Sequence, residues 1–275
     1  LAHMTIGEYP FNVPDSYFIE YPNWEKEKKD FPKFKEIAQK IKVAENGLSG
    51  GVSLEDFNND GLIDVFLTSY GTKDQCKFFI NKGSGFKDST EEAGLAGLVG
   101  GLNTVHADYN NDGFTDIFIL RGAWLGKGGK HPNSLLRNNG DGTFSDVTKS
   151  SGLLSFHPTQ TAAWADVNND GYLDLFIGNE SRSNESHSCE LYINQKNGKF
   201  LEKSSEYNLS SIKGFVKGVV FGDINNDQWP DLYLSVMGGV NLLFRNDFGI
   251  FKNISKSAGV EDPKYSFTSW FWDVN

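Results

Sequence analysis

Short apolar runs alternate with acidic turns along this chain, and the alternation repeats at a regular interval. One apolar run follows each acidic turn, at 65–68, 117–120, 175–178 and 232–235. A second run follows at 78–81, 135–138, 191–194 and 242–246, and a third begins at Phe86, Phe144, Phe200 and Phe251. A fourth run, such as 161–165, leads into the next acidic turn. Four short strands in each repeat of about fifty residues predict an all-β chain of four-stranded blades, as in a β-propeller.

The acidic turns are copies of one nine-residue motif, Asp-x-Asn-x-Asp-Gly-x-x-Asp. Four copies begin at Asp56, Asp108, Asp166 and Asp223, and a fifth begins at Asp273, two residues before the sequence ends. A β-sandwich that happens to share Asn-Asp-Gly turns is the alternative, but four near-identical motifs in matching contexts disfavour it. We therefore expect about four and a half blades in an incomplete ring, with an exposed apolar face at each end.

The repeat also sets the expected domain boundaries. The segment 34–37 aligns with the third strand that begins at Phe86, so it is interpreted as the outer strand of a preceding blade. Residues 34–275 are accordingly assigned to the propeller, truncated in the fifth motif. Residues 1–33 match no part of the repeat and are assigned to a cloning remnant and an N-terminal extension.

The motif predicts a calcium loop. It places side-chain oxygens at positions 1, 3, 5 and 9 and a backbone carbonyl at position 7, and Ca²⁺ takes six to eight hard oxygen ligands. His and Cys are absent from the motif, which disfavours zinc and softer metals. Asp, Asn and Gly are also ordinary turn formers, but the clustered carboxylates would then repel one another without compensation. The expected ligands are Asp56, Asn58, Asp60, Leu62, Asp64, Asp108, Asn110, Asp112, Phe114, Asp116, Asp166, Asn168, Asp170, Tyr172, Asp174, Asp223, Asn225, Asp227, Trp229 and Asp231.

The fourth loop departs from the motif, because Gln228 replaces the glycine at position 6 and Pro230 precedes the last ligand. We therefore expect three to four bound Ca²⁺ ions.

The formal net charge of −10 and the pI near 5.0 argue against a nucleic-acid partner. Four calcium ions would bring that charge to about −2. No apolar run is long enough for insertion into a membrane.

Two cysteines and two long loops complete the picture. Cys76 and Cys189 each lie five residues before an equivalent Asn, so they occupy the same place in different blades and should not be paired.

The loops 121–133 and 179–188 should lie on the rim opposite the acidic motifs. Trp124, in the first loop, has cationic neighbours and is either a partner contact or a side chain packed over a blade edge. No nucleophile–base pair or phosphate-binding loop is evident, so we do not expect an enzyme.

The chain resembles the FG-GAP/VCBS-repeat β-propellers, which include the integrin α-subunit heads, and in particular their ASPIC/UnbV branch. The resemblance extends over about 34–275 and includes segments between the acidic motifs, at 120–126, 132–144, 215–218 and 269–273. It implies a propeller, often seven-bladed, with calcium loops on one rim. The C-terminal domain of the ASPIC/UnbV branch is absent from this sequence.

The resemblance also implies a function, since members are typically exported and bind or scaffold rather than catalyse. We therefore expect a secreted, cell-surface or periplasmic module with a protein or glycan ligand. Two alternatives stay open: a calcium-dependent polysaccharide-active enzyme domain, and a purely structural spacer of a larger surface protein.

Overall fold

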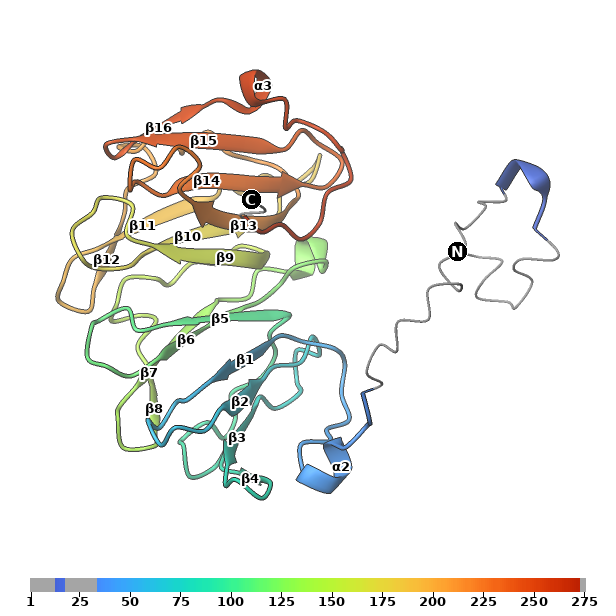
Figure 1. Ribbon diagram of the computed structural model, residues 1–275, viewed down its shortest axis with the longest axis vertical. Helices are drawn as coiled ribbons and strands as arrows, with labels where there is room; N and C mark the ends of the chain where they lie inside the picture. The colour runs from blue at the N-terminus through green and yellow to red at the C-terminus, as the bar shows by residue number, and fades with distance from the viewer. Residues whose placement is uncertain (1–12, 18–33, 273–275) are drawn as a thin grey trace. The chain divides into compact units, whose positions relative to one another are not determined.

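The computed structural model describes residues 13–17 and 34–272 (Figure 1). The chain divides into two units, 1–37 and 38–275. The first contains one described helical turn, η1 (Asp15–Tyr17), and the second contains α2 (Ala38–Ile41), η3 (Gly126–Gly128), α3 (Ser255–Ala258) and all the described strands. The fifth motif lies outside the described residues.

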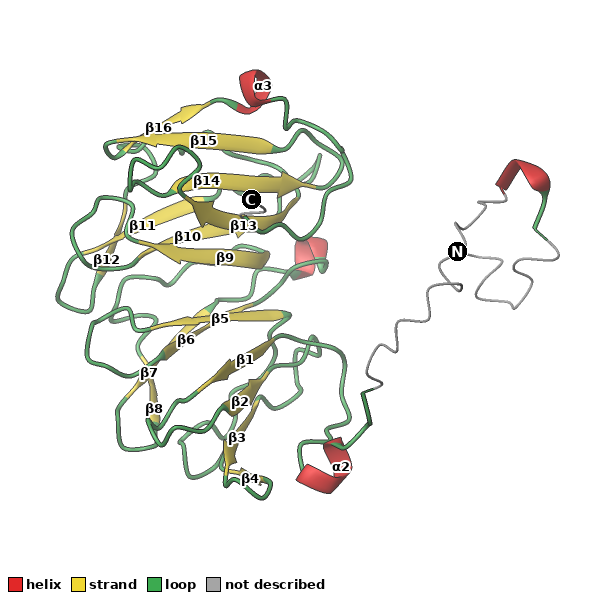
Figure 2. Ribbon diagram, viewed as in Figure 1, coloured by secondary structure: helices red, strands yellow, loops and turns green. Residues whose placement is uncertain are grey.

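The second unit consists of four antiparallel sheets of four strands each, here called blades 1 to 4 (Figure 2). Blade 1 is β1 (Val52–Glu55), β2 (Asp64–Leu67), β3 (Lys77–Asn81) and β4 (Phe86–Asp88). Blade 2 is β5 (Asn103–Ala107), β6 (Asp116–Leu120), β7 (Ser134–Asn138) and β8 (Phe144–Asp146). Blade 3 is β9 (Thr159–Ala165), β10 (Asp174–Asn179), β11 (Glu190–Asn194) and β12 (Phe200–Glu202). Blade 4 is β13 (Val216–Gly222), β14 (Asp231–Val236), β15 (Leu242–Asp247) and β16 (Ile250–Asn253).

The strands of each blade pair in chain order, so the predicted all-β architecture of four-stranded blades is confirmed. The first strands of successive blades are neighbours, from β1 through β5 and β9 to β13, and the described strands do not close a ring. The segment 34–37 forms no strand and leads directly into α2, so the expected outer strand of a preceding blade is wrong. That segment has no partner strand in the described chain, and an unpaired strand leaves its backbone groups unsatisfied.

Separate hydrophobic clusters fill the three interfaces between adjacent blades. The second strand of each inner blade is apolar on both faces, and all five residues of β6 are buried. Successive side chains of a strand point to opposite faces of the sheet. Ile117 and Ile119 accordingly belong to the cluster with blade 1, whereas Phe118 and Leu120 belong to the cluster with blade 3.

The residue at motif position 2 connects the loop to the core in blades 1 to 3, whereas in blade 4 it is Ile224, which is 41% exposed. In blade 1 this residue is Phe57, whose ring lies 5.8 Å from that of Phe78 and 6.0 Å from that of Phe144, both edge-on. Phe144 belongs to blade 2, so the aromatic trio crosses the interface. Edge-to-face pairs add about 0.5–1.5 kcal/mol beyond the burial of their area.

The two cysteines are equivalent, as expected, and neither forms a disulfide. Cys76 and Cys189 are both buried, and each donates its backbone N–H to the carbonyl of the connection to the next blade, at Leu98 and Ile212 respectively. Burial raises the pKa of the Cys76 thiol to about 11 and that of Cys189 to about 12. Both thiols therefore pack as apolar groups in the blade interfaces.

The end blades expose apolar residues. Val52 in β1 is 50% exposed, whereas the residues in the same place in the other blades are 5–8% exposed: Thr104, Ala162 and Val219. At the other end, the segment 265–272 lies against blade 4, since Ser235 Oγ donates to the carbonyl of Phe267 and the Phe271 ring packs edge-on to Tyr233. Trp270 and Trp272 of that segment are mostly exposed.

Candidate functional site

The four acidic motifs form the loops between the first and second strands of each blade and so lie at one end of the blades. Position 6 requires a left-handed backbone. The glycines there have φ between 86° and 88°, at Gly61, Gly113 and Gly171. Gln228 adopts φ 69° at the same position, which a side chain makes costly. The fourth loop therefore keeps the conformation of the others at a greater backbone strain.

The side chains at positions 1, 3 and 5 fold inward over their own loop. In the second loop both carboxylate oxygens of Asp108 accept N–H groups, from Asp112 at 3.1 Å and Gly113 at 2.8 Å. The same Asp112 N–H is also 3.1 Å from Asn110 Oδ1. The other three loops repeat these bonds with nearly the same distances. Position 7 contributes its N–H to the carboxylate at position 5.

The aspartate at position 9 is buried at the start of the second strand in every blade. One oxygen accepts the N–H of an Asn in the third strand, as Asp116 does from Asn138 at 2.8 Å. The other accepts the N–H at position 2 in blades 2 to 4, but Asp64 Oδ2 is buried without a hydrogen-bond partner. Burial raises the pKa of Asp116 to about 8, and the neighbouring carboxylates add to the rise.

The donor chemistry of the loops fits a hard cation. Among the described residues, the one ion pair between a motif carboxylate and a Lys or Arg joins Asp170 to Lys196 at 3.4 Å. Over the same residues, no three His, Cys, Asp or Glu side chains converge as a preformed metal cluster. The Asn oxygen at position 3 and the carbonyl at position 7 would thus have to contribute alongside the carboxylates, as calcium's preference for many mixed oxygen ligands allows.

The asparagine at position 4, which the sequence analysis did not single out, connects the loops. It has φ between 55° and 58° in all four copies. Its side-chain amide donates to the carbonyl at position 6 of the next loop, as Asn59 does to Gly113 at 3.0 Å and Asn111 to Gly171 at 2.9 Å. Asn169 repeats the contact with Gln228. The sequence has an Asn at this position in every copy of the motif. Because Asn is also an ordinary turn residue, its presence alone does not predict the contact between loops.

The opposite rim holds a buried ion pair that the sequence analysis missed. Lys217 and Glu180 are in direct contact, and their side chains are 0% and 1% exposed. Lys217 Nζ also donates to Gln160 Oε1 at 2.8 Å, and it lies 3.6 Å from the centre of the Trp124 ring. Burial lowers the pKa of Lys217 to about 8, although contact with Glu180 opposes the shift.

Trp124 is held by several neighbours, although it is 38% exposed. Its ring lies edge-on to Phe215 at 5.0 Å and stacks on Phe267 at 6.2 Å, and its indole N–H donates to Gln160. Its backbone N–H donates to Glu180 at 2.9 Å. The second of the two sequence interpretations, a Trp packed over a blade edge, therefore describes it better. The cluster ties the 121–133 loop of blade 2 to blades 3 and 4.

Two histidines meet beside this cluster. His157 and His187 approach at 2.8 Å between their Nδ1 atoms, and Glu185 lies 3.5 Å from Nε2 of His187. Lys130, in the other long loop, pairs with the same Glu185 at 3.0 Å. Burial and the neighbouring His157 lower the pKa of His187. The Lys130–Glu185 ion pair thus joins the two long loops.

The motif spacing, the blade topology and the loop geometry agree with one known repeat. The sequence profile of the FG-GAP-like repeat matches residues 56–119, 108–177 and 166–234, which together are more than half of the chain. The chain belongs to the FG-GAP-like repeat family. The resemblance inferred from the motifs is thereby confirmed.

The relatives agree with the ASPIC/UnbV branch. Cartilage acidic protein 1 of Xenopus tropicalis is 30% identical over 145 residues, which are 52% of this chain and 21% of that protein. The protein of the same name in Homo sapiens is 29% identical over 164 residues, 58% of this chain and 23% of that protein. The matched region thus spans about a fifth of the length of these relatives.

Among solved structures, the crystal structure of the V. cholerae biofilm matrix protein Bap1 is similar at a TM-score of 0.37 and 14% identity. The match covers 76% of this chain and 41% of that one. Within the described residues, no helix of this chain is both long and apolar enough to cross a bilayer.

Proposed function

We propose that this FG-GAP-repeat chain is a calcium-binding, non-catalytic propeller module that binds or scaffolds an extracellular protein or glycan. The observation that carries the proposal is the fourfold recurrence of one loop geometry. In each copy, the oxygens of positions 1 and 3 accept the N–H of position 5, and an oxygen of position 5 accepts the N–H of position 7. A turn can form without three clustered carboxylates. Calcium, in contrast, requires several oxygen ligands around each ion.

The charge distribution supports the same proposal. The loops hold carboxylates almost without cationic partners among the described residues, and no hydrogen bond is formed to the buried Asp64 Oδ2. A divalent cation held by positions 1, 3, 5, 7 and 9 would supply the missing charge. It would also join the buried aspartate of the second strand to the exposed part of the loop, and the Asn59–Gly113 type of contact would extend that order to the next blade.

An extracellular or periplasmic setting follows from two considerations. Calcium sites of modest affinity are filled where the ion is abundant, outside the cytosol. The relatives are named for cartilage, a tissue composed largely of extracellular matrix. The binding role is assigned to the rim opposite the loops, because there the blades differ from one another, as an individual ligand site requires.

Calcium titration calorimetry on single-loop variants tests the metal part of the proposal. Asp112→Ala removes the position-5 ligand of the second loop, and we expect the number of bound ions to fall by one. Asp141→Ala is the matched control, because Asp141 is an acidic turn residue outside the motifs. Its stoichiometry should equal that of the unchanged chain. Absence of saturable calcium binding, or equal loss in both variants, would contradict the assignment.

A further inference from the structure

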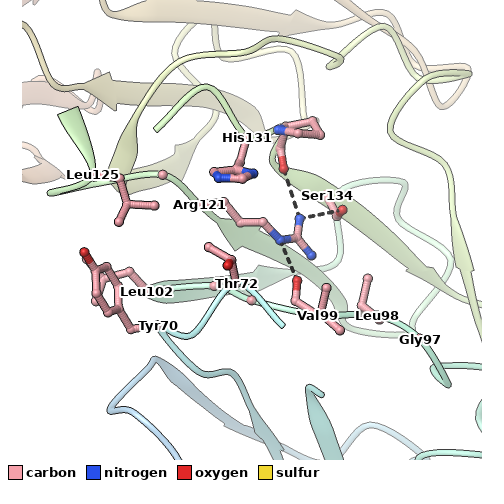
Figure 3. Close-up of a pocket in the computed structure, with 14 residues that line it drawn as sticks. Tyr70, Thr72, Gly97, Leu98, Val99, Leu102, Arg121, Leu125, His131 and Ser134 are labelled. Atoms are coloured by element: carbon pink, nitrogen blue, oxygen red, sulfur yellow. Dashed lines mark hydrogen bonds between the residues drawn. The ribbon is translucent and has the colours of Figure 1, made fainter. Parts of the chain in front are cut away.

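A pocket lies between blades 1 and 2 on the rim opposite the calcium loops, with a volume of about 290 Å³. Three segments line it: the β2–β3 loop, the connection 97–102 between the blades, and the β6–β7 loop with the start of β7. Figure 3 shows the Arg121 side chain among these segments, near the His131 ring. The volume is at the lower end of the range for small-molecule sites, about 300–1,000 Å³.

Arg121 has an unusual set of partners. Its Nε donates to the carbonyl of Val99 at 3.0 Å, and Nη1 donates to the carbonyl of Pro132 at 3.1 Å and to Ser134 Oγ at 2.8 Å. A guanidinium has five N–H donors, so the two on Nη2 are left over. Over residues 34–272, no protein acceptor takes them and no carboxylate lies within ion-pair distance of Arg121.

The other largely buried cation of this rim shows what is missing. Lys217 is held by Glu180 and Gln160, which supply a counter-charge from within the chain. Arg121 is hydrogen-bonded only to neutral oxygens; burial lowers its pKa, and the charge of Asp146, which forms no ion pair with it, only partly opposes that shift. Removing a cation from water without a directly paired counter-ion is costly, so such a site favours an anion that reaches it from solvent. The three fixed hydrogen bonds orient the guanidinium in advance of binding.

The walls of the pocket define the rest of the ligand. Leu98, Leu102 and Leu125 contribute apolar surface, and Tyr70 and Thr72 add hydroxyl groups to the lining. A ligand with many hydroxyls would leave most of them unpaired against the leucines. The two remaining N–H groups both belong to Nη2 and diverge, so a carboxylate oxygen can accept one of them in a charge-assisted hydrogen bond.

We propose that this pocket binds a carboxylate carried on a compact apolar body, with the carboxylate on Arg121 and the apolar body against the leucines. The inference deepens the binding role of the proposed function and does not depend on its calcium part. A free aromatic acid and the C-terminal carboxylate of a peptide share this chemistry.

Titration of the calcium-saturated chain with phenylacetate and with N-acetyl-leucine, each against its neutral amide, tests the proposal. We expect each acid to bind at least about 10-fold more tightly than its amide, since a charge-assisted hydrogen bond is lost in the amide. The acid that binds more tightly identifies whether a free acid or a peptide end is the better ligand. Equal affinity of acid and amide, or no binding of either acid, would overturn the proposal. Glucuronate binding more tightly than both acids would overturn the apolar part.

Two variants locate the binding. Arg121→Gln should weaken acid binding at least about 10-fold and leave amide binding unchanged. Because Arg121 also holds Val99 and Pro132, Thr72→Trp is the second variant: Thr72 is exposed, lines the pocket and should block it without disturbing the core. Lys73→Trp is its matched control, at an exposed neighbour outside the pocket lining. Acid binding that survives Thr72→Trp, or that Lys73→Trp abolishes equally, would refute this location. Calcium titration of the same samples keeps this outcome separate from a failure of the metal loops.

Discussion

The two rims of the propeller differ in whether their loops repeat from blade to blade. On the rim of the acidic motifs, all four blades present the same loop with the same hydrogen bonds, and an Asn connects each loop to the next. On the other rim, three features occur once each: a pocket around Arg121, a buried Lys217–Glu180 pair, and two facing histidines. The repeated loops are suited to binding one ion in each blade, as proposed above. The features that occur once are suited to a single ligand site per molecule.

The comparison predicts different sensitivities to mutation. A change in one motif loop removes one of four similar units, and its effect should be local. A change in the Lys217 cluster removes a connection that joins three blades and has no second copy. The predictions below run from the largest expected effect to the smallest.

Lys217→Met should be the most damaging of these substitutions. It leaves Glu180 buried without its cation, and breaking a buried pair in this way costs about 3–5 kcal/mol of unfolding free energy. Denaturant unfolding measures the loss. The double variant Lys217→Met/Glu180→Leu should recover most of it, because an apolar pair of similar volume avoids the isolated charge. A single variant as stable as the parent chain would show that the pair does not hold the loop in place.

A reciprocal exchange at position 6 tests the equivalence of the loops. Gly113→Gln should lower the free energy of unfolding by about 1 kcal/mol, because a side chain at φ 88° is strained. A Cβ on Gly113 would meet no atom within 4 Å, so the effect is one of backbone conformation alone. Gln228→Gly should produce a smaller gain of about 0.5 kcal/mol. Paired thermal melts measure both changes; shifts of the same sign would indicate that the fourth loop is not equivalent to the second.

The difference between the rims also decides what could be predicted from sequence. The blades, their strand order and the unpaired Cys76 and Cys189 could be predicted by comparing the chain with itself, because the same pattern of strands and turns occurs four times. The proposed strand at 34–37 failed because alignment with Phe86 supplies a pattern but not a pairing partner. Lys217 and Glu180 lie 37 residues apart on different blades and recur nowhere else, so no periodicity could bring them together.

We expect the carboxylates of the four loops to bind calcium in the folded state only. A ligand that binds only the native chain stabilises it by mass action, by about 2.7 kcal/mol for each site at one hundred times its dissociation constant.

The melting temperature with excess Ca²⁺, compared with that in a chelator, tests this claim most directly. The account predicts that chelation lowers the melting temperature by several degrees, and that Ca²⁺ restores it while Mg²⁺ at the same concentration does so less well. Identical melting curves in Ca²⁺ and in chelator would contradict the calcium assignment for the whole rim.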